Sequence, residues 1–258
     1  MFRFKNLRGL LLPALLFGVW WWGSSQEWWN SFLLPSPSRV GAAAADLFRR
    51  GILMTHVKVS LFRVLAGCGL AFGAAFPLGV FCGRSSLLRS LVLPLLEALR
   101  HIPPLAILPL LILWFGIGET SKLMVILMAS FFPIFLNTLS GIAHCDTKLL
   151  EVGTTLNLSF RDTFRHILLP GALPSVLVGL RLGMGYGWRA LIGAELIAAV
   201  SGIGYMIHDA EQLSRTDVVI VGVVLMGILG SLLDALFFTL TCSLLPWKGA
   251  KMHDDPLV

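Results

Sequence analysis

Six long apolar stretches constrain what this sequence can fold into more than any other feature. They lie roughly at 8–23, 58–82, 88–115, 121–143, 171–199 and 217–245. A bilayer hydrocarbon core of about 30 Å takes about 20 helical residues to cross, and no stretch has the strict alternation of a membrane barrel strand. We therefore predict an all-α, polytopic membrane protein with about six transmembrane helices.

Composition excludes the main alternatives to a membrane protein. Apolar residues make up 56% of the 258 residues and charged residues only 13%, whereas soluble domains carry about 25% charged residues. The net charge of +6 comes from scattered Lys and Arg, so it indicates basic loops at the inner membrane face and not a nucleic-acid interface. The four cysteines form no C-x-x-C pair, and we interpret them as small buried residues.

The first apolar stretch has two interpretations. It follows a basic start and ends with Gly-Ser-Ser at 23–25, as a cleaved signal peptide does. However, three tryptophans at 20–22 crowd the would-be cleavage site, and two more follow at 28–29. Such an aromatic belt is typical of a membrane interface, so we favour an uncleaved membrane anchor.

The placement of Lys and Arg predicts the orientation of the chain. The inner segments carry Arg3, Lys5, Arg8, Arg84, Arg89, Lys148, Arg161, Arg165, Lys248 and Lys251. The two short outer loops carry only Lys122 and Arg215, although the outer segment before residue 58 is a basic exception. The positive-inside rule then puts both termini in the cytoplasm. We expect an anchor and outer interfacial segment over 1–57, a transmembrane domain over 58–245 with a cytoplasmic loop 144–170, and a cytoplasmic tail over 246–258.

The predicted cytoplasmic loop is the most informative segment. It is too polar to span a membrane, yet large apolar residues recur through it at helical spacing. Asp146 or Thr147 can cap a first short helix, and Ser159 opens a capping box for a second. Asn157 between them tolerates a left-handed turn. We therefore predict two short helices at an angle, followed by a fifth span that starts near Pro170.

This loop resembles the EAA signature of ABC importer permeases. That signature reads E-A-A, three residues, G, nine residues and I-x-L-P. The matching residues of this chain, at the same spacing, are Glu151, Val152, Gly153, Asn157, Ile167 and Pro170. Val152 replaces the usual alanine, and Asn157 replaces the usual glycine. Two further stretches, within 100–118 and 187–206, are similar to the branch of the family that imports sulfonates, taurine and nitrate.

The resemblance implies a type I permease fold that works with other subunits in the bilayer. Those partners are a second permease subunit, with a homodimer expected, two cytoplasmic ABC ATPases and an external solute-binding protein. The ATPases would bind the loop at Glu151, Val152, Gly153, Asn157, Leu158, Ile167 and Pro170. The chain has no Gly-Lys dipeptide and hence no P-loop. We therefore expect a transport subunit that is not an enzyme and has no cofactor of its own, with ATP hydrolysed by its partners.

Charged and proline residues inside the spans mark a candidate translocation path. The candidates are Pro103, Pro104, Arg181, Trp188, Arg189 and Glu195. Positive groups along a path suit an anion, whereas pairing of an arginine with Glu195 or Asp234 is the structural alternative, and both remain open here. The two adjacent prolines predict a bend or a break in the third stretch.

We predict the membrane-spanning permease subunit of an ATP-driven ABC importer in a bacterial inner membrane. The expected solute is a small anion such as an aliphatic sulfonate, and a permease for taurine, nitrate or another small organic solute is the nearest alternative. A gradient-driven secondary transporter is disfavoured because the sequence shows no duplicated halves. Catalysis and metal binding are not expected, because the chain shows neither a nucleophile–base pattern nor metal-ligand spacing among its six histidines.

Overall fold

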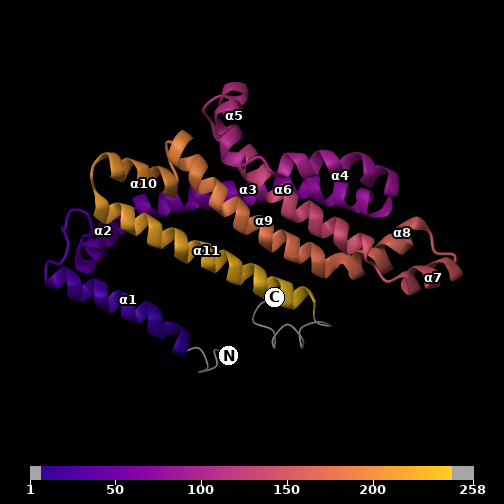
Figure 1. The fold of residues 1–258 in the computed structure, drawn as a ribbon, viewed down its shortest axis with the longest axis horizontal. Coiled ribbons are helices and arrows are strands. Elements are labelled where there is room, and N and C mark those ends of the chain that lie inside the picture. Colours follow the sequence, from indigo (N-terminus) through magenta and orange to yellow (C-terminus); the bar gives the residue numbers. More distant parts are fainter. Residues whose placement is uncertain (1–6, 246–258) are drawn as a thin grey trace. The chain divides into compact units, whose positions relative to one another are not determined.

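The computed structural model describes residues 7–245, and every regular element within them is helical (Figure 1). The α-helices are α1 (Leu7–Ser25), α2 (Pro37–Arg49), α3 (Ile52–Arg84), α4 (Ser86–Arg100), α5 (Leu108–Phe115), α6 (Glu119–Ala143), α7 (Thr147–Thr155), α8 (Phe160–Thr163), α9 (Leu169–Ala198), α10 (Ile203–Gln212) and α11 (Thr216–Leu244). A 3-10 turn over Pro104–Ile107 precedes α5, and a π-helical turn over Phe164–Leu168 joins α8 to α9. The predicted all-α class is confirmed.

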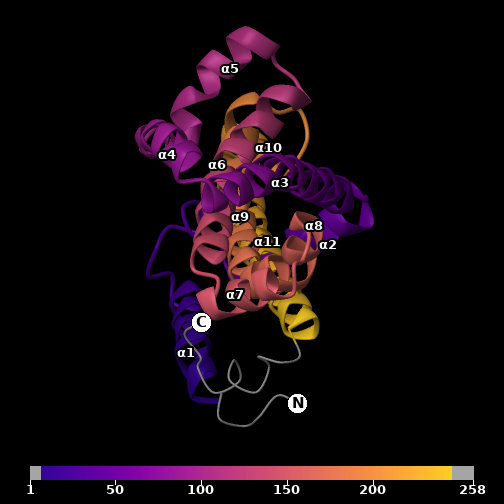
Figure 2. The same ribbon diagram turned by 90° about the vertical axis from the view of Figure 1, so that its right-hand side faces the viewer.

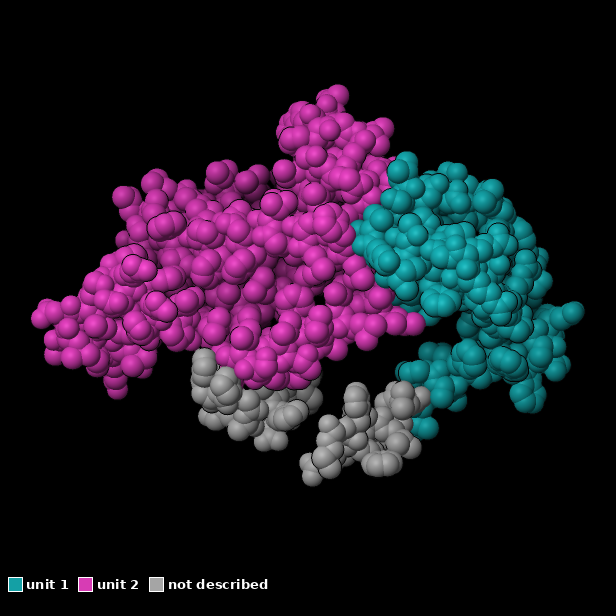
Figure 3. Space-filling model, turned by 180° about the vertical axis from the view of Figure 1, so that it is seen from behind, with its two compact units in different colours: residues 1–59, 200–227 teal, residues 60–199, 228–258 magenta. Residues whose placement is uncertain are grey.

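The chain divides into two compact units (Figure 3). Unit 1 comprises residues 1–59 and 200–227, and unit 2 comprises residues 60–199 and 228–258. The divisions fall inside α3 and α11. Some predictions concern residues outside the described part of the chain, namely the tail 246–258 and the inner basic residues Arg3, Lys5, Lys248 and Lys251.

Four helices within residues 7–245 are long and apolar enough to cross a membrane. They are α3, α6, the continuous helix Phe160–Ala198 that includes α9, and α11; the bent pair of α4 and α5 makes a fifth if it is counted as one span. Within residues 7–245, four or five helices therefore meet this criterion of length and composition, compared with the six stretches predicted. The first stretch does form the helix α1, but Arg8, three tryptophans and two serines leave it only a short apolar run.

The third apolar stretch is broken, as its adjacent prolines predict. α4 ends at Arg100, the chain resumes as a 3-10 turn at Pro104, and the two parts differ in direction by 83°. A proline has no N–H to donate, and its ring crowds the preceding turn, so neither Pro103 nor Pro104 continues α4. Figures 1 and 2 both show α5 turned away from the direction of α4.

The core of unit 2 lies where α3, α6 and α9 pack together. Glycine allows α9 to approach α6 closely: a Cβ atom at Gly183 would lie 2.8 Å from Ile134 Cγ1 and 3.0 Å from the carbonyl oxygen of Ser130. Gly179 and Gly187, one turn away on either side, meet α6 in the same manner. Small residues at this spacing are typical of helix pairs in lipid, where close backbone contact supplies the attraction.

Unit 1 contains α1, α2, α10 and the first part of α11. The indole N–H of Trp20 donates to the carbonyl oxygen of Pro35 at 3.1 Å, which ties the end of α1 to the start of α2. Ser36 caps α2 by accepting a hydrogen bond from the Arg39 N–H. α2 is amphipathic and buries Val40, Ala43 and Leu47, so a helix does occupy the segment predicted to be interfacial.

Candidate functional site

The segment between α6 and α9, residues 146–168, contains the short helix α7 and, after a turn, α8 and the π-helical turn; we call it the signature segment. The first predicted short helix is present, whereas the second is the start of the continuous helix Phe160–Ala198. Asp146 caps α7 by accepting from the Lys148 N–H at 2.9 Å, and Asn157 takes the left-handed conformation with φ +49°. Ser159 caps α8, but its hydroxyl contacts the Asp162 carboxylate at 2.5 Å. The predicted capping box is therefore modified, because the carboxylate binds the cap side chain and not the cap backbone.

Gly153 is the packing centre of the signature segment. It is buried, and a Cβ atom there would lie 2.9 Å from Ile167 Cδ1 and 3.8 Å from Leu158 Cδ1. Three residues singled out by the resemblance thus meet in one place and join α7 to the π-helical turn. The Arg84 guanidinium lies 4.5 Å from the centre of the Phe160 ring, a cation–π contact that links the segment to the end of α3.

Several apolar side chains of the signature segment are exposed. Leu149, Val152, Leu156 and Phe160 are between 49% and 65% exposed, and Glu151 is exposed as well. The segment lies at one end of α6 and α9 (Figure 1). An exposed apolar face on short helices is a surface that a partner protein can bind.

Pro170 lies in the first turn of α9, but the prediction that the fifth span starts there needs correction. The helix already runs through Phe160–Leu168, so the second part of the signature segment continues directly into the span. Pro170 lacks the N–H that would bond to the His166 carbonyl. The chain is π-helical at that point, where the Leu169 N–H donates to the Phe164 carbonyl.

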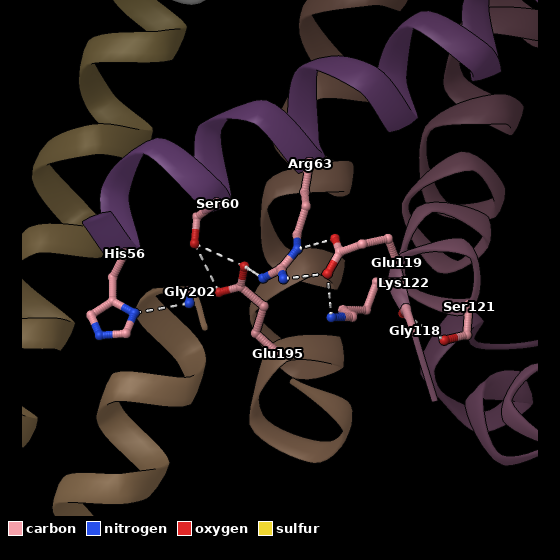
Figure 4. Close-up of polar contacts among 9 residues, drawn as sticks. All are labelled: His56, Ser60, Arg63, Gly118, Glu119, Ser121, Lys122, Glu195 and Gly202. Atoms are coloured by element: carbon pink, nitrogen blue, oxygen red, sulfur yellow. Dashed lines mark hydrogen bonds and ion pairs between the residues drawn. The ribbon is translucent and has the colours of Figure 1, made fainter. Parts of the chain in front are cut away.

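A cluster of charges lies at the other end of α6 and α9 from the signature segment (Figure 4). Arg63 on α3 donates from Nε and Nη2 to the Glu119 carboxylate, at 2.6 Å each, and from Nη1 to Glu195 at 2.8 Å. Ser60 Oγ lies 2.8 Å from Glu195 Oε1, and Lys122 Nζ donates to Glu119 at 2.8 Å. We call these five residues the Arg63 cluster, and it ties α3, α6 and α9 together.

The Arg63 cluster changes the interpretation of two residues. Glu195, a candidate path residue, is 1% exposed and held in an ion pair, which is the structural alternative left open above. Lys122 was expected in a short outer loop, but it lies in the first turn of α6 and is 2% exposed. Glu119, the carboxylate that links Arg63 to Lys122, was missed by sequence reasoning because nothing local marks it as a partner of Arg63.

Arg181 and Trp188 lie together on another part of α9. The Arg181 guanidinium donates two hydrogen bonds to Asp234 of α11, at 2.6 and 2.7 Å. Trp188 is 7% exposed and packs against Gly230. Arg181, Trp188 and Asp234 line a cavity of only about 40 Å³, little more than the volume of a water molecule. The geometry again fits the pairing alternative for Arg181.

A much larger cavity, of about 700 Å³, lies in unit 2 beside the proline break. The residues around the end of α4 form one wall, and α6 and α9 form the others. Three predicted path residues, Pro103, Pro104 and Arg189, line it. Its other polar lining residues are Arg100, His101, Asn137 and Tyr186. The six predicted path residues are thus divided among the large cavity, the small cavity and the Arg63 cluster.

The large cavity could be predicted only in part. Arg189 and the two prolines were found as a charge and a helix breaker, whereas Tyr186 carried no sequence signal. The Arg189 guanidinium lies 5.4 Å from the centre of the Tyr186 ring. Within residues 7–245, no group of three or more His, Cys, Asp or Glu side chains gathers as metal ligands do. The arrangement offers a cavity lined by two arginines and a segment with exposed apolar side chains.

Comparison with known proteins agrees with this arrangement. The family model described as "binding-protein-dependent transport system inner membrane component" matches residues 75–241. The putative aliphatic sulfonates transport permease protein SsuC of Bacillus subtilis is 36% identical, over 96% of this chain and 90% of its own length. The taurine transport system permease protein TauC of Escherichia coli is 36% identical over 92% of this chain and 88% of its own, and the nitrate import permease protein NrtB of Synechocystis is 33% identical over 89% and 86%.

A solved structure supports the fold. A chain from "Inward facing conformations of the MetNI methionine ABC transporter" aligns with a TM-score of 0.57, over 70% of this chain and 92% of its own, at 17% identity. Fold and comparisons together define a multi-pass inner-membrane transport permease. The chain belongs to the family of binding-protein-dependent transport system inner membrane components, the permeases of ABC importers. The resemblance to the sulfonate, taurine and nitrate branch is confirmed.

Proposed function

We propose that this chain carries a small organic anion across the inner membrane and takes its energy from two partner ATPases that bind the signature segment. The observation that carries this proposal is the set of exposed apolar side chains on a segment whose two parts pack together at Gly153. α7 packs through Gly153 against Ile167, and Ile167 lies in the continuous helix Phe160–Ala198, so movement of α7 by a partner is passed to a membrane helix.

The signature segment then faces the cytoplasm, where the ATPases hydrolyse ATP, and both chain termini lie on the same side. The chain itself is not an enzyme, and an external binding protein delivers the solute. A second permease subunit, in the simplest case a second copy of this chain, completes the path. Residues 58–245 act as the transport domain, with 1–57 as an anchor. These assignments follow from the family and from the positive-inside distribution of Lys and Arg.

The solute class follows from two lines of support. Relatives of this chain are named for aliphatic sulfonates, taurine and nitrate, which all carry an anionic group. The large cavity that contains Pro103, Pro104 and Arg189 also contains Arg100, so it presents two guanidinium groups. We assign the solute path to this cavity and an aliphatic sulfonate as the preferred cargo.

A matched pair of substitutions tests the role of the signature segment. Leu156→Asp introduces a charge on the exposed face of the segment, and Leu213→Asp introduces the same charge at an equally exposed residue (65%) outside it. We expect Leu156→Asp to abolish co-purification of the permease with its ATPase and Leu213→Asp to leave it intact. An intact complex with Leu156→Asp, in a permease that elutes normally in gel filtration, would show that the ATPase binds elsewhere.

A further inference from the structure

We propose that the large cavity is a solute-binding site within the permease itself, in which Arg100 and Arg189 hold the anionic head of an organic anion and the apolar wall holds its tail. This inference rests on the proposed function as an anion permease and adds that the permease selects among anions without help from the external receptor.

Two arginines in the long helices of unit 2 are held in ion pairs, and two others face the large cavity. Arg63 is neutralised by Glu119 and Glu195, and Arg181 is neutralised by Asp234. Among residues 7–245, neither Arg100 nor Arg189 has an ion pair, and both line the same cavity. The chain thus supplies counter-charges to Arg63 and Arg181 but not to the two arginines of the cavity. Among residues 7–245, Arg84 and Arg89 have no ion pair either, but neither lines the cavity.

An uncompensated arginine in a membrane helix is expensive, at about 2.5–3.5 kcal/mol on insertion scales. Such a residue is retained where it meets water, a partner or an anionic ligand. Guanidinium groups bind oxyanions through two parallel N–H donors. Two of them in a cavity of about 700 Å³, within the ordinary range for small-molecule sites, are suited to a sulfonate group.

The apolar residues that line the cavity indicate the chemistry of the ligand beyond its anionic head. Leu105, Met128, Phe132, Leu136 and Leu182 give it an extended apolar wall, which favours an alkyl chain over a bare inorganic anion such as nitrate. Among the described residues that line the cavity there is no Asp or Glu. A zwitterion such as taurine would therefore find no carboxylate for its ammonium group, and its ammonium would lie near two guanidinium groups. The cavity is suited to unsubstituted alkanesulfonates.

Binding measurements on the assembled permease and ATPase complex in lipid nanodiscs, without receptor, test this site. The probes are hexanesulfonate, methanesulfonate and taurine, titrated by calorimetry. We expect hexanesulfonate to bind most tightly, with affinity rising by up to about fourfold for each methylene group that is buried. Taurine should bind more weakly than an alkanesulfonate of equal length.

Variants then locate the site. We expect Arg100→Gln and Arg189→Gln each to weaken hexanesulfonate binding by about tenfold or more, and Arg189→Lys to lose less because it keeps the charge. Phe132→Ala should weaken hexanesulfonate binding but leave methanesulfonate binding unchanged. Arg49→Gln, on α2 in unit 1 and not among the residues that line the cavity, is the control and should have no effect.

Unchanged hexanesulfonate binding in both glutamine variants would overturn the inference, and so would taurine binding as tightly as the matched alkanesulfonate. Dissociation of the complex by these substitutions would also overturn it, because the cavity would then be a subunit contact. ATP-driven uptake by the same preparations separates this inference from the proposed function. If uptake persists with an unchanged KM in Arg100→Gln and Arg189→Gln, the binding site is wrong and the permease function stands. If the wild-type complex binds hexanesulfonate but hydrolysis of ATP drives no uptake, the proposed function is wrong and the binding site stands.

Discussion

α9 contributes to two polar regions of unit 2, one in which an arginine is buried in ion pairs and one in which an arginine is exposed without an ion pair among the described residues. In the Arg63 cluster, the guanidinium is 1% exposed and contacts two carboxylates. In the large cavity, Arg189 is exposed and its described neighbour is the Tyr186 ring. Both arginines lie among apolar helices, so the difference is not one of composition but of whether the chain provides the counter-charge.

This difference in ion pairing indicates a structural role for the Arg63 cluster and a transport role for the large cavity. A buried charge that is fully paired fixes helices in one arrangement, because its removal leaves its partner without compensation. A charge left unpaired beside an open cavity adds little to stability, but it is available to an incoming anion. The Arg63 cluster is accordingly a structural joint between α3, α6 and α9, and the cavity is the region where substitutions should alter transport.

The largest effect is expected from Arg63→Met. It leaves the Glu195 carboxylate buried without its cation, which should cost about 3–5 kcal/mol of stability and lower the thermal unfolding midpoint in detergent markedly. Arg189→Met, at the cavity, should change the midpoint little. Equal losses of stability at the two sites would remove the distinction between them.

A second test compares two glycines of α9. Gly183→Leu places a side chain against Ile134 and the Ser130 backbone, and overpacking of this kind costs about 1–3 kcal/mol. Gly185→Leu is the matched control, because a Cβ atom at Gly185 meets nothing within 4 Å. The thermal unfolding midpoint should fall for Gly183→Leu and stay near that of the wild type for Gly185→Leu. An unchanged midpoint for Gly183→Leu would show that α6 and α9 do not pack closely.

A third test compares a packed residue and an exposed residue of the signature segment. Gly153→Val crowds Ile167 and Leu158, but these are flexible side-chain ends, so we expect a loss of about 1 kcal/mol together with weaker ATP-driven transport. Val152→Asp, on the neighbouring exposed residue, should leave stability unchanged and reduce ATPase binding in a pull-down. The reverse pattern would mean that the exposed and packed faces are assigned the wrong way round.

The smallest effect is expected from Arg181→Gln. The pair with Asp234 is partly exposed, with 32% of the arginine and 52% of the aspartate side chain accessible. Partly exposed ion pairs and polar contacts in membrane bundles contribute about 1 kcal/mol or less. A thermal shift approaching that of Arg63→Met would show that this pair is as essential as the buried cluster.

Local chemistry explains what could be predicted from the sequence. The cap at Asp146, the left-handed Asn157 and the break at Pro103 each depend on one residue and its immediate neighbours. The family signature added the residues that meet around Gly153. These features required no knowledge of tertiary structure.

The tertiary partners could not be predicted in the same way. Arg63 meets Glu119 and Glu195, which are 56 and 132 residues away along the chain, so no spacing rule connects them. The large cavity depends likewise on three helices meeting at a break. The spacing of seven residues places Arg181, Trp188 and Glu195 on one face of α9, but spacing does not show that this face meets different neighbours along its length.

The central claim is that this chain carries the solute while its partners supply the energy through the signature segment. Uptake of radiolabelled ethanesulfonate by proteoliposomes that contain the complete transporter and its external receptor tests this most directly. We predict uptake that requires ATP and that is lost with Leu156→Asp while the permease remains folded. Uptake by the permease alone, driven by a proton or sodium gradient and insensitive to ATP, would contradict the account.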